Sequence, residues 1–411
     1  RHGRFSVLTP QYRDDSAIAE LVFGIQDTSS QLALPTILLW DQMEPGRGRQ
    51  TLMNLPGMNE SLADALLEWI DAVDETREFG AESEFYLGLE PPRQPPNRPP
   101  ARIEDLRAGR GMTAWQLLGA QDGVTTIRTS DGANNIATTL DMNSDDSQSG
   151  QTWLTPAPPW SHFLTVRSAA RNESASGDTR VDLNQSNLTA LRTALTDRCE
   201  PACVRFILAY RQFGPAQIEL SSATTEEIPE IPLSQPARYQ LKSPLDLVDA
   251  VVQVPEASGE PDAEPTAYAS PFRTDEPASL EALVSFCDSA TTETQPILEG
   301  RINVLMAPRS VLLGVPGLSS EQVDGVLDAR QSPHDDTSSR SHPVWLLAEG
   351  LANLNTMQQI WPYLNCGGDV FRAQIIAFYD AQSPFTRVEF VVDGTSGRTS
   401  PLYYRDLRRL G

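Results

Sequence analysis

A chain of 411 residues with 39% hydrophobic and 21% charged residues has globular proportions and can bury cores in two or three domains. Its 55 carboxylates against 32 basic residues give a net charge of -23, which repels nucleic acid and anionic lipid at long range. The only lysine, Lys242, follows Leu241 rather than a glycine, so a phosphate-binding Walker A loop is excluded.

The first forty residues predict extended structure. Short apolar runs at Phe5 to Leu8 and Leu21 to Ile25 have the length and composition of strands. A polar turn at Asp27 to Ser30 separates them from Leu32 to Leu34. We expect these segments to form the N-terminal part of a sheet domain, residues 1–40.

A helix that runs into a series of acids follows. Leu62, Leu66, Trp69 and Ile70 recur at three- and four-residue intervals, which places them on one helical face. The acids that come next are Asp71, Asp74, Glu75, Glu78, Glu82 and Glu84. Such charges repel one another unless water screens them or a hard cation neutralises them. The run is therefore either a solvated face, the usual outcome, or a calcium site that lacks the EF-hand spacing.

Catalytic arrangements have little support. The acidic run could supply a carboxylate pair for glycoside hydrolysis, but it lacks the aromatic and polar residues that surround such pairs. Ser396 lies in a glycine turn without the G-x-S-x-G order, and a hairpin explains that turn better. The motif H-E-x-x-H is absent, and only four histidines occur. A hydrolase therefore ranks third among the functions.

Prolines dominate residues 91–100. Because each proline removes a backbone donor and fixes φ, this stretch predicts an extended surface strap. Ile103 to Leu118 predicts a return to helix, broken at Gly109 to Gly111. Together with the acidic helix these segments make an inserted helical domain, residues 41–140, which a polar linker at 141–152 follows.

Two further units are expected before the C-terminal strands. In residues 153–240 we expect strands at Phe163 to Arg167 and Arg180 to Leu183, and a helix with leucine spacing from Leu188 to Leu195. Residues 241–340 make a third unit. It carries a second Pro-Gly turn of the kind described below.

Residues 341–411 are expected to add antiparallel strands. The segments Val370 to Tyr379, Arg387 to Val392 and Pro401 to Tyr404 have the alternation and turn residues of such strands. In the second segment the alternation predicts two faces, one with Val388, Phe390 and Val392 and the other with Arg387, Glu389 and Val391.

The four cysteines, Cys199, Cys203, Cys287 and Cys366, suit two disulfides in an extracytoplasmic protein. Cys199 and Cys203 could bridge across the short segment between them, while three connectivities stay open. A zinc site is a weaker interpretation, because the histidines show no ligand spacing with the cysteines.

Two turns of the order hydrophobic-Pro-Gly-hydrophobic, Leu55 to Met58 and Val315 to Leu318, resemble helix-hairpin-helix elements. In DNA-binding proteins such a turn points backbone amides at a phosphate. Glu60 and Asp64 follow the first turn, and Glu321 and Asp324 follow the second. These acids would repel a phosphate, so a tight interhelical turn is the simpler interpretation. A helix-hairpin-helix DNA-binding or DNA-uptake protein is the alternative function.

The acidic module carries a family resemblance. Its residues Trp69-Ile70-Asp71, Asp74-Glu75, Arg77, Gly80-Ala81-Glu82 and Phe85-Tyr86 resemble the signature of general secretion pathway protein K, the large minor pseudopilin of type II secretion systems. Further segments that resemble the family, in the same order, are Ile103 to Thr113, Gly300 to Leu312 and Leu402 to Arg405. Asp27 to Leu34 stands where the family has Asp-Glu-x-Gly-Lys-hydrophobic-Asn, with the Gly, Lys and Asn substituted.

This resemblance implies a non-enzymatic subunit at the tip of the pseudopilus, which acts in pseudopilus assembly and protein export. It implies the I and J pseudopilins as partners and no nucleic acid. It also implies calcium beside the acidic run. The first-choice ligands are Asp71, Asp74 and Glu82, with Glu75 and Glu84 in reserve.

The expected fold is α+β. A pilin-like antiparallel sheet from the N- and C-terminal segments carries large, mainly helical insertions with helix-hairpin-helix-like repeats. No apolar run approaches the ~18 residues that a membrane span needs, and the first residue is Arg rather than Met. We therefore expect a processed or truncated chain. The full-length protein would be anchored on the periplasmic side of the inner membrane through an N-terminal helix absent from this chain.

Overall fold

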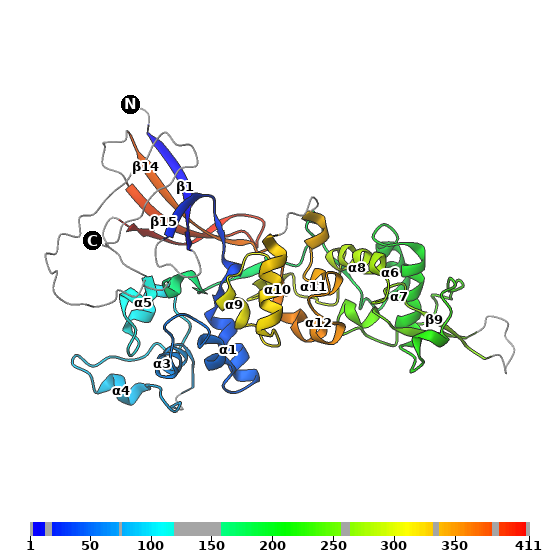
Figure 1. The fold of residues 1–411 in the computed structure, drawn as a ribbon, viewed down its shortest axis with the longest axis horizontal. Coiled ribbons are helices and arrows are strands. Elements are labelled where there is room, and N and C mark those ends of the chain that lie inside the picture. The colour runs from blue at the N-terminus through cyan, green and yellow to red at the C-terminus, as the bar shows by residue number, and fades with distance from the viewer. Residues whose placement is uncertain are drawn as a thin grey trace. The chain divides into compact units, whose positions relative to one another are not determined.

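The computed structural model describes residues 3–12, 19–73, 76–118, 158–255, 264–331, 337–379 and 386–407 (Figure 1). The chain divides into two compact units. Unit 1 comprises Arg1–Arg171, Ile297–Val323 and Gly367–Gly411, and unit 2 comprises Asn172–Pro296 and Asp324–Cys366. Unit 1 therefore contains both ends of the chain. The five-part division expected from the sequence stays a prediction.

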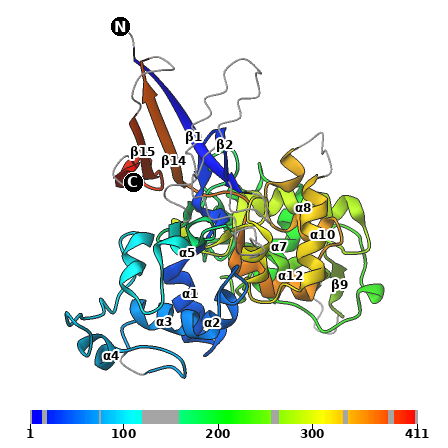
Figure 2. The ribbon, with the colours of Figure 1, turned by 60° about the vertical axis from the view of Figure 1, so that its left-hand side comes forward.

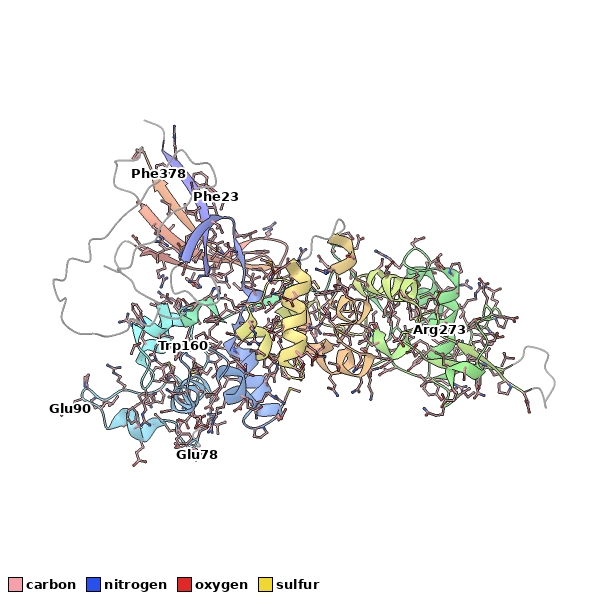
Figure 3. The ribbon with its side chains drawn as sticks, in the orientation of Figure 1. Phe23, Glu78, Glu90, Trp160, Arg273 and Phe378 are labelled. Atoms are coloured by element: carbon pink, nitrogen blue, oxygen red, sulfur yellow. The ribbon has the colours of Figure 1, made fainter. Side chains whose placement is uncertain are left out.

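An antiparallel sheet in unit 1 joins the two ends of the chain (Figure 1). Its strand order is β16-β15-β14-β1-β2, and β3 also pairs with β14. The bounds are β1 Arg4–Tyr12, β2 Ala19–Phe23, β3 Gln26–Asp27, β14 Val370–Phe378, β15 Thr386–Asp393 and β16 Ser400–Asp406. Phe378 packs against the small cluster of Leu8 and Ile376 (Figure 3). The expected sheet of N- and C-terminal segments is confirmed.

One face of this sheet buries a charged network. Glu389 and Val391 of β15 share that face, as the alternation predicts, and both are buried. Glu389 accepts a hydrogen bond from Arg372 at 2.7 Å and lies 3.3 Å from Arg405, which also pairs with Glu104. Burial alone would raise the pKa of Glu389, but the two guanidinium groups outweigh it and lower the pKa. The last strand is thereby held by charge to a residue of the insertion.

Asp27, at the end of β3, holds the backbone at the point where the chain leaves the sheet and enters the helical part of unit 1. Its carboxylate accepts hydrogen bonds from the Ser29 amide at 2.8 Å, the Ser29 hydroxyl at 2.6 Å and the Asn303 side-chain amide at 2.9 Å. A Cβ on Gly368 would overlap the same carboxylate, so the backbone approaches it closely there. The turn expected at Asp27 to Ser30 is therefore a short helix, η1 (Thr28–Ser30), which Asp27 caps.

Short helices and two-residue or three-residue strands make up the rest of unit 1 (Figure 2). The helices are α1 Leu34–Met43, α2 Arg47–Leu52, α3 Glu60–Ile70, α4 Ser83–Leu87, η2 Ile103–Ala108, α5 Ala114–Leu118, η3 Trp160–His162 and α9 Arg309–Leu313. The strands are β4 Leu32–Ala33 with β5 Leu164–Thr165, β6 Ala169–Arg171 with β11 Ile297–Glu299, and β12 Ile302–Asn303. Trp160 is fully buried and donates to the Pro56 carbonyl at 2.9 Å (Figure 3).

Unit 2 surrounds a buried arginine. Its elements are β7 Val181–Asp182, α6 Leu188–Leu195, α7 Pro201–Phe213, η4 Leu220–Ser222, η5 Pro244–Leu247, β8 Val251–Val254, β9 Thr266–Ala269, α8 Pro277–Ser289, β10 Ala290–Thr291, η6 Thr337–Arg340, α11 Trp345–Ala348, α12 Leu354–Ile360, η7 Trp361–Tyr363 and β13 Leu364–Asn365. Arg211 of α7 is 2% exposed and donates to the carbonyls of Leu183, Asn184 and Gln185 at 2.7, 3.1 and 3.0 Å. Since a buried guanidinium needs acceptors, these bonds hold the segment after β7 against α7.

Two sequence expectations change in detail. The helix expected from Ile103 to Leu118 is broken at Gly109 to Gly111 as expected, but the part before the break is the 3-10 helix η2, in which the Asp105 side chain accepts from the Arg102 amide at 3.1 Å. The strand expected at Phe163 to Arg167 covers only Leu164–Thr165. The Pro-Gly turn before α10 (Ser320–Gln331) lies between two helices, as expected. Within the described ranges, no helix is long and apolar enough to cross a membrane.

The buried network of the sheet predicts an acid-sensitive fold. Glu389→Gln removes the charge that compensates Arg372 and Arg405, which should cost about 3–5 kcal/mol of unfolding free energy at neutral pH. Because the folded pKa of Glu389 is lowered, its stabilising contribution is present above the unfolded pKa and lost as pH falls through the folded one. Urea unfolding across an acidic pH series should therefore show a shallower pH dependence for the variant.

Glu44→Gln is the matched control, because Glu44 pairs with Arg47 at the surface. Its removal should change the unfolding free energy by about 0–1 kcal/mol. Equal pH profiles for the wild-type protein and Glu389→Gln would contradict this role of Glu389.

Candidate functional site

The candidate site is built on α3, the helix that the apolar spacing predicts. Asn59 caps the first turn by accepting a hydrogen bond from the Leu62 amide at 3.0 Å. Leu66 is fully buried, and the Trp69 ring lies 4.9 Å from the ring of Tyr86, centroid to centroid. Residues 63–70 are buried without interruption, so α3 is enclosed on all sides.

Two carboxylates one turn apart, Asp64 and Glu68, are buried within this enclosed helix. Glu68 accepts hydrogen bonds from the backbone amides of Arg77 and Ala81. Burial raises the pKa of Glu68, and the two amides act in the opposite direction. A Cβ on Gly80 would overlap the Glu68 carboxylate, so any other residue there would displace that carboxylate. Glu68 is thus the anchor for the far side of the acidic loop, residues 71–84.

Asp64 holds the same loop through a second set of contacts. Its carboxylate accepts hydrogen bonds from Arg49 of α2 at 2.7 and 2.5 Å and from the Phe79 amide at 3.2 Å. The Arg49 guanidinium also lies 5.6 Å from the centre of the Phe79 ring. Glu78, which is labelled in Figure 3, is exposed, and its carboxylate lies 3.8 Å from the Arg49 guanidinium. The loop therefore turns its backbone donors inward and the Glu78 side chain outward.

Arg77 is a cation supplied by the acidic loop itself. Its guanidinium lies 2.6 Å from Asp71 and 3.0 Å from Asp41 of α1. Asp71 is 5% exposed and also accepts from the Val73 amide at 3.2 Å. The first-choice calcium ligand Asp71 is therefore engaged by an arginine. This bidentate role suits Arg because its planar group reaches two carboxylates at once.

The other expected calcium ligands have different surroundings. Glu82 is buried and directly precedes α4, whereas Glu84 is exposed in the first turn of α4. Asp74 and Glu75 lie outside the described residues. In the described part of the chain, no three His, Cys, Asp or Glu side chains gather so that they could hold a metal ion. Carboxylate oxygens are the donors that calcium takes, and the calcium site stays a prediction.

The sequence did not predict that Asp64 and Glu68 anchor the acidic loop, although a signal for this role was present. The neighbours Ala63, Ala65 and Leu67 are small or apolar and face away from the predicted stripe. A helix that is apolar on every side is a buried helix, so an acid within it must be buried as well and must find donors. The acids after the helix are conspicuous in the sequence because they are many, but Asp64 and Glu68 within the helix are the residues that hold the loop.

The Pro-Gly turns act as interhelical connections. The Met58 amide donates to the Leu55 carbonyl at 3.1 Å, and the Leu318 amide to the Val315 carbonyl at 3.3 Å. Gly57 has a φ of 69°, a left-handed value that favours glycine. Each turn is followed by an acid in the first helical turn, Glu60 in α3 and Glu321 in α10. That charge opposes phosphate binding at either helix start, and the DNA-binding alternative is not favoured.

Comparison with known proteins finds one matching family model. Residues 42–128 match the model described as type II secretion system (T2SS), protein K. That stretch contains α3 and the acidic loop. The search of curated proteins found no match. A chain in the crystal structure of the GspK-GspI-GspJ complex from the enterotoxigenic Escherichia coli type 2 secretion system aligns with 97% of this chain and 83% of its own length, at 12% identity and a TM-score of 0.38.

The close approach of Gly80 to Glu68 predicts a sharp effect of one added methyl group. Gly80→Ala forces the Glu68 carboxylate away from the Arg77 and Ala81 amides, which should lower the unfolding free energy by about 1–3 kcal/mol. Gly88→Ala is the control, since its Cβ would meet only backbone oxygens at 3.5 Å and its φ of -78° suits any residue. Thermal unfolding of both variants measures the difference, and equal Tm values would show that Glu68 does not anchor the loop.

Proposed function

We propose that this chain, a member of the type II secretion system protein K family by the domain at residues 42–128, is a non-enzymatic minor pseudopilin at the tip of the pseudopilus. It would act in pseudopilus assembly and protein export. The observation that carries the proposal is the matched domain, in which α3 and the acidic loop form one module.

The use of charge in this module supports a structural rather than a catalytic role. Asp64, Glu68 and Asp71 are each bound to an arginine or to backbone amides of the same module. A general acid or base must instead reach a substrate proton with a group that is available to it. These three carboxylates therefore stabilise the conformation of the loop.

Assembly requires a surface, and the sheet offers one. The strand registers place Phe5 and Val7 of β1, Ile375 of β14, Phe390 of β15 and Tyr404 of β16 on one face. Phe5 is 70% exposed and Tyr404 62% exposed, while the other three are half-buried. We call this the apolar sheet face. Exposed aromatic side chains on a rigid sheet are suited to bind a protein partner.

The partners proposed for this face are the minor pseudopilins of the I and J types, which the family implies. The same family implies a location on the periplasmic side of the inner membrane, with a membrane anchor in the full-length protein. The net charge of -23 is consistent with a protein that works through protein contacts rather than nucleic acid.

Complex formation tests the function. Mixed with the I and J pseudopilins of the same secretion system, the chain should elute with both in one size-exclusion peak. Phe5→Ser combined with Tyr404→Ser should raise the Kd about thirtyfold or more, because truncated aromatic anchors cost about 1–2 kcal/mol or more each.

Leu39→Ser is the matched control, since Leu39 is 53% exposed on α1 and lies outside the apolar sheet face. It should leave the Kd unchanged. Absence of any complex would overturn the proposed function, whereas a complex that the double variant does not weaken would move the interface to another surface.

We further propose calcium as the ion of the acidic loop, bound through the expected ligands that Arg77 does not occupy. Added calcium should raise the Tm of the wild-type chain, and Asp74→Ala should abolish that rise. Glu78→Ala should keep it, because Glu78 is an exposed acid outside the expected ligand set. Asp71→Ala should lower the Tm with or without calcium, since Arg77 loses a partner either way. Equal wild-type Tm values in calcium and in chelator would exclude the ion.

A further inference from the structure

Two cysteines of unit 2 meet where α6 is followed by α7. Cys199 lies in the bend between the two helices, and its amide donates to the Leu195 carbonyl at 3.2 Å. Cys203 lies in the first turn of α7, which begins at Pro201. The thiols of Cys199 and Cys203 are hydrogen-bonded to each other. The two sulfur atoms are thus already adjacent in the folded chain.

The position of Cys199 outside the helix matters for bond formation. Two helical residues four apart have Cβ atoms about 5–6 Å from each other, farther than the about 3.5–4.5 Å of a disulfide. Cys199 precedes the N-cap Glu200, so its backbone is not bound to helical geometry. Pro201 at the first helical position fixes φ and makes the start of α7 stiff, while the Cys199 side remains adjustable.

Access to the pair runs through Cys199. This residue is half-buried and lines a cavity of about 320 Å³, together with Val204, Leu208 and Ile231. Cys203 is 4% exposed. A reagent that enters the cavity therefore reaches the Cys199 sulfur first, and Cys203 can react only with a sulfur already held beside it.

The two remaining cysteines have other surroundings. Cys287 of α8 is fully buried, and Cys366 is half-buried directly after β13. Burial raises the pKa of both thiols, which keeps them protonated and slow to react. Each serves as an internal reference for a cysteine that should stay reduced.

We propose that Cys199 and Cys203 form a disulfide in the mature protein, closing the junction between α6 and α7 in unit 2. The bond would join the bend to the first turn of α7 and fix the Cys199 wall of the cavity. This inference rests on the proposed function only for the location of the protein, because disulfides are stable in oxidising compartments outside the cytoplasm.

The chemistry is thiol–disulfide exchange with a small disulfide oxidant such as oxidised glutathione. The Cys199 thiolate, having lost its proton to solvent, attacks one glutathione sulfur, forms a mixed disulfide and releases one reduced glutathione. The Cys203 thiol then loses its proton and attacks the Cys199 sulfur, which releases the second glutathione. Two electrons pass from the cysteine pair to the oxidant, and two protons are taken up by the released glutathione thiolates.

The second step should be the slower one and should depend on pH. In the reduced chain the hydrogen bond with Cys199, and then burial, raise the pKa of the Cys203 thiol well above its ordinary value, and burial still raises this pKa once Cys199 carries glutathione. Little Cys203 thiolate is present at neutral pH, so closure should accelerate about tenfold for each unit of pH below that pKa. The mixed disulfide should accumulate at low pH and disappear at high pH.

Tryptic mapping tests the pair directly. Trypsin cuts after Arg198 and Arg205, so one peptide, residues 199–205, contains both cysteines. The full chain is equilibrated with graded ratios of reduced and oxidised glutathione, quenched with acid, unfolded and alkylated. The expected product is a 199–205 peptide that lacks two hydrogen atoms and carries no alkyl group, while the peptides with Cys287 and Cys366 are fully alkylated.

Two variants complete the test. Cys199→Ser should leave Cys203 alkylated under all conditions, and Cys366→Ser should leave the internal disulfide intact. A 199–205 peptide with two alkyl groups at every glutathione ratio would overturn the proposal, and so would a link from Cys203 to Cys287. The measurement needs no pseudopilin partner, so its failure and the failure of complex formation with the I and J pseudopilins are separate results.

Discussion

The insertion in unit 1 depends on two carboxylates that α3 buries. Asp64 and Glu68 lie in an enclosed helix, where a carboxylate without donors would cost several kcal/mol. The donors are the amides of Phe79, Arg77 and Ala81 in the loop that follows and, for Asp64, also Arg49 of α2. The helix therefore needs the loop to satisfy its acids, and the loop needs the helix to fix its course. Charge-assisted hydrogen bonds of this kind contribute about 1.5–3 kcal/mol each.

The same principle recurs in the sheet, where arginine is again the base that neutralises a buried acid. Glu389 is buried beneath Arg372 and Arg405, as Asp71 is bound by Arg77. Arginine stays charged when buried and its planar group can bind two acceptors, whereas a buried lysine tends to lose its proton. Rigid, charge-matched units of this kind would suit the proposed role in assembly, in which a surface must keep one shape.

The sequence predicted much of the fold and less of the site, for physical reasons. Alternation around Val388 and Glu389 predicted the strand and its two faces, and the spacing of Leu62, Leu66 and Trp69 predicted α3. Alternation does not predict which face of the strand is covered. Here the face with the charged Glu389 is buried, because arginines of other strands neutralise its carboxylate. The acids of the loop were visible as a run, but the anchoring role of Glu68 depends on amides nine and thirteen residues later. Such pairing depends on the tertiary structure and produces no periodic pattern in the sequence.

Hydrogen exchange of the Arg77 and Ala81 amides, measured by NMR in the calcium-free chain, tests the central claim most directly. If Glu68 accepts both hydrogen bonds, these two amides should exchange as slowly as those in the middle of α3, although they lie in a loop. Exchange of either amide at the rate of an open peptide would contradict the account.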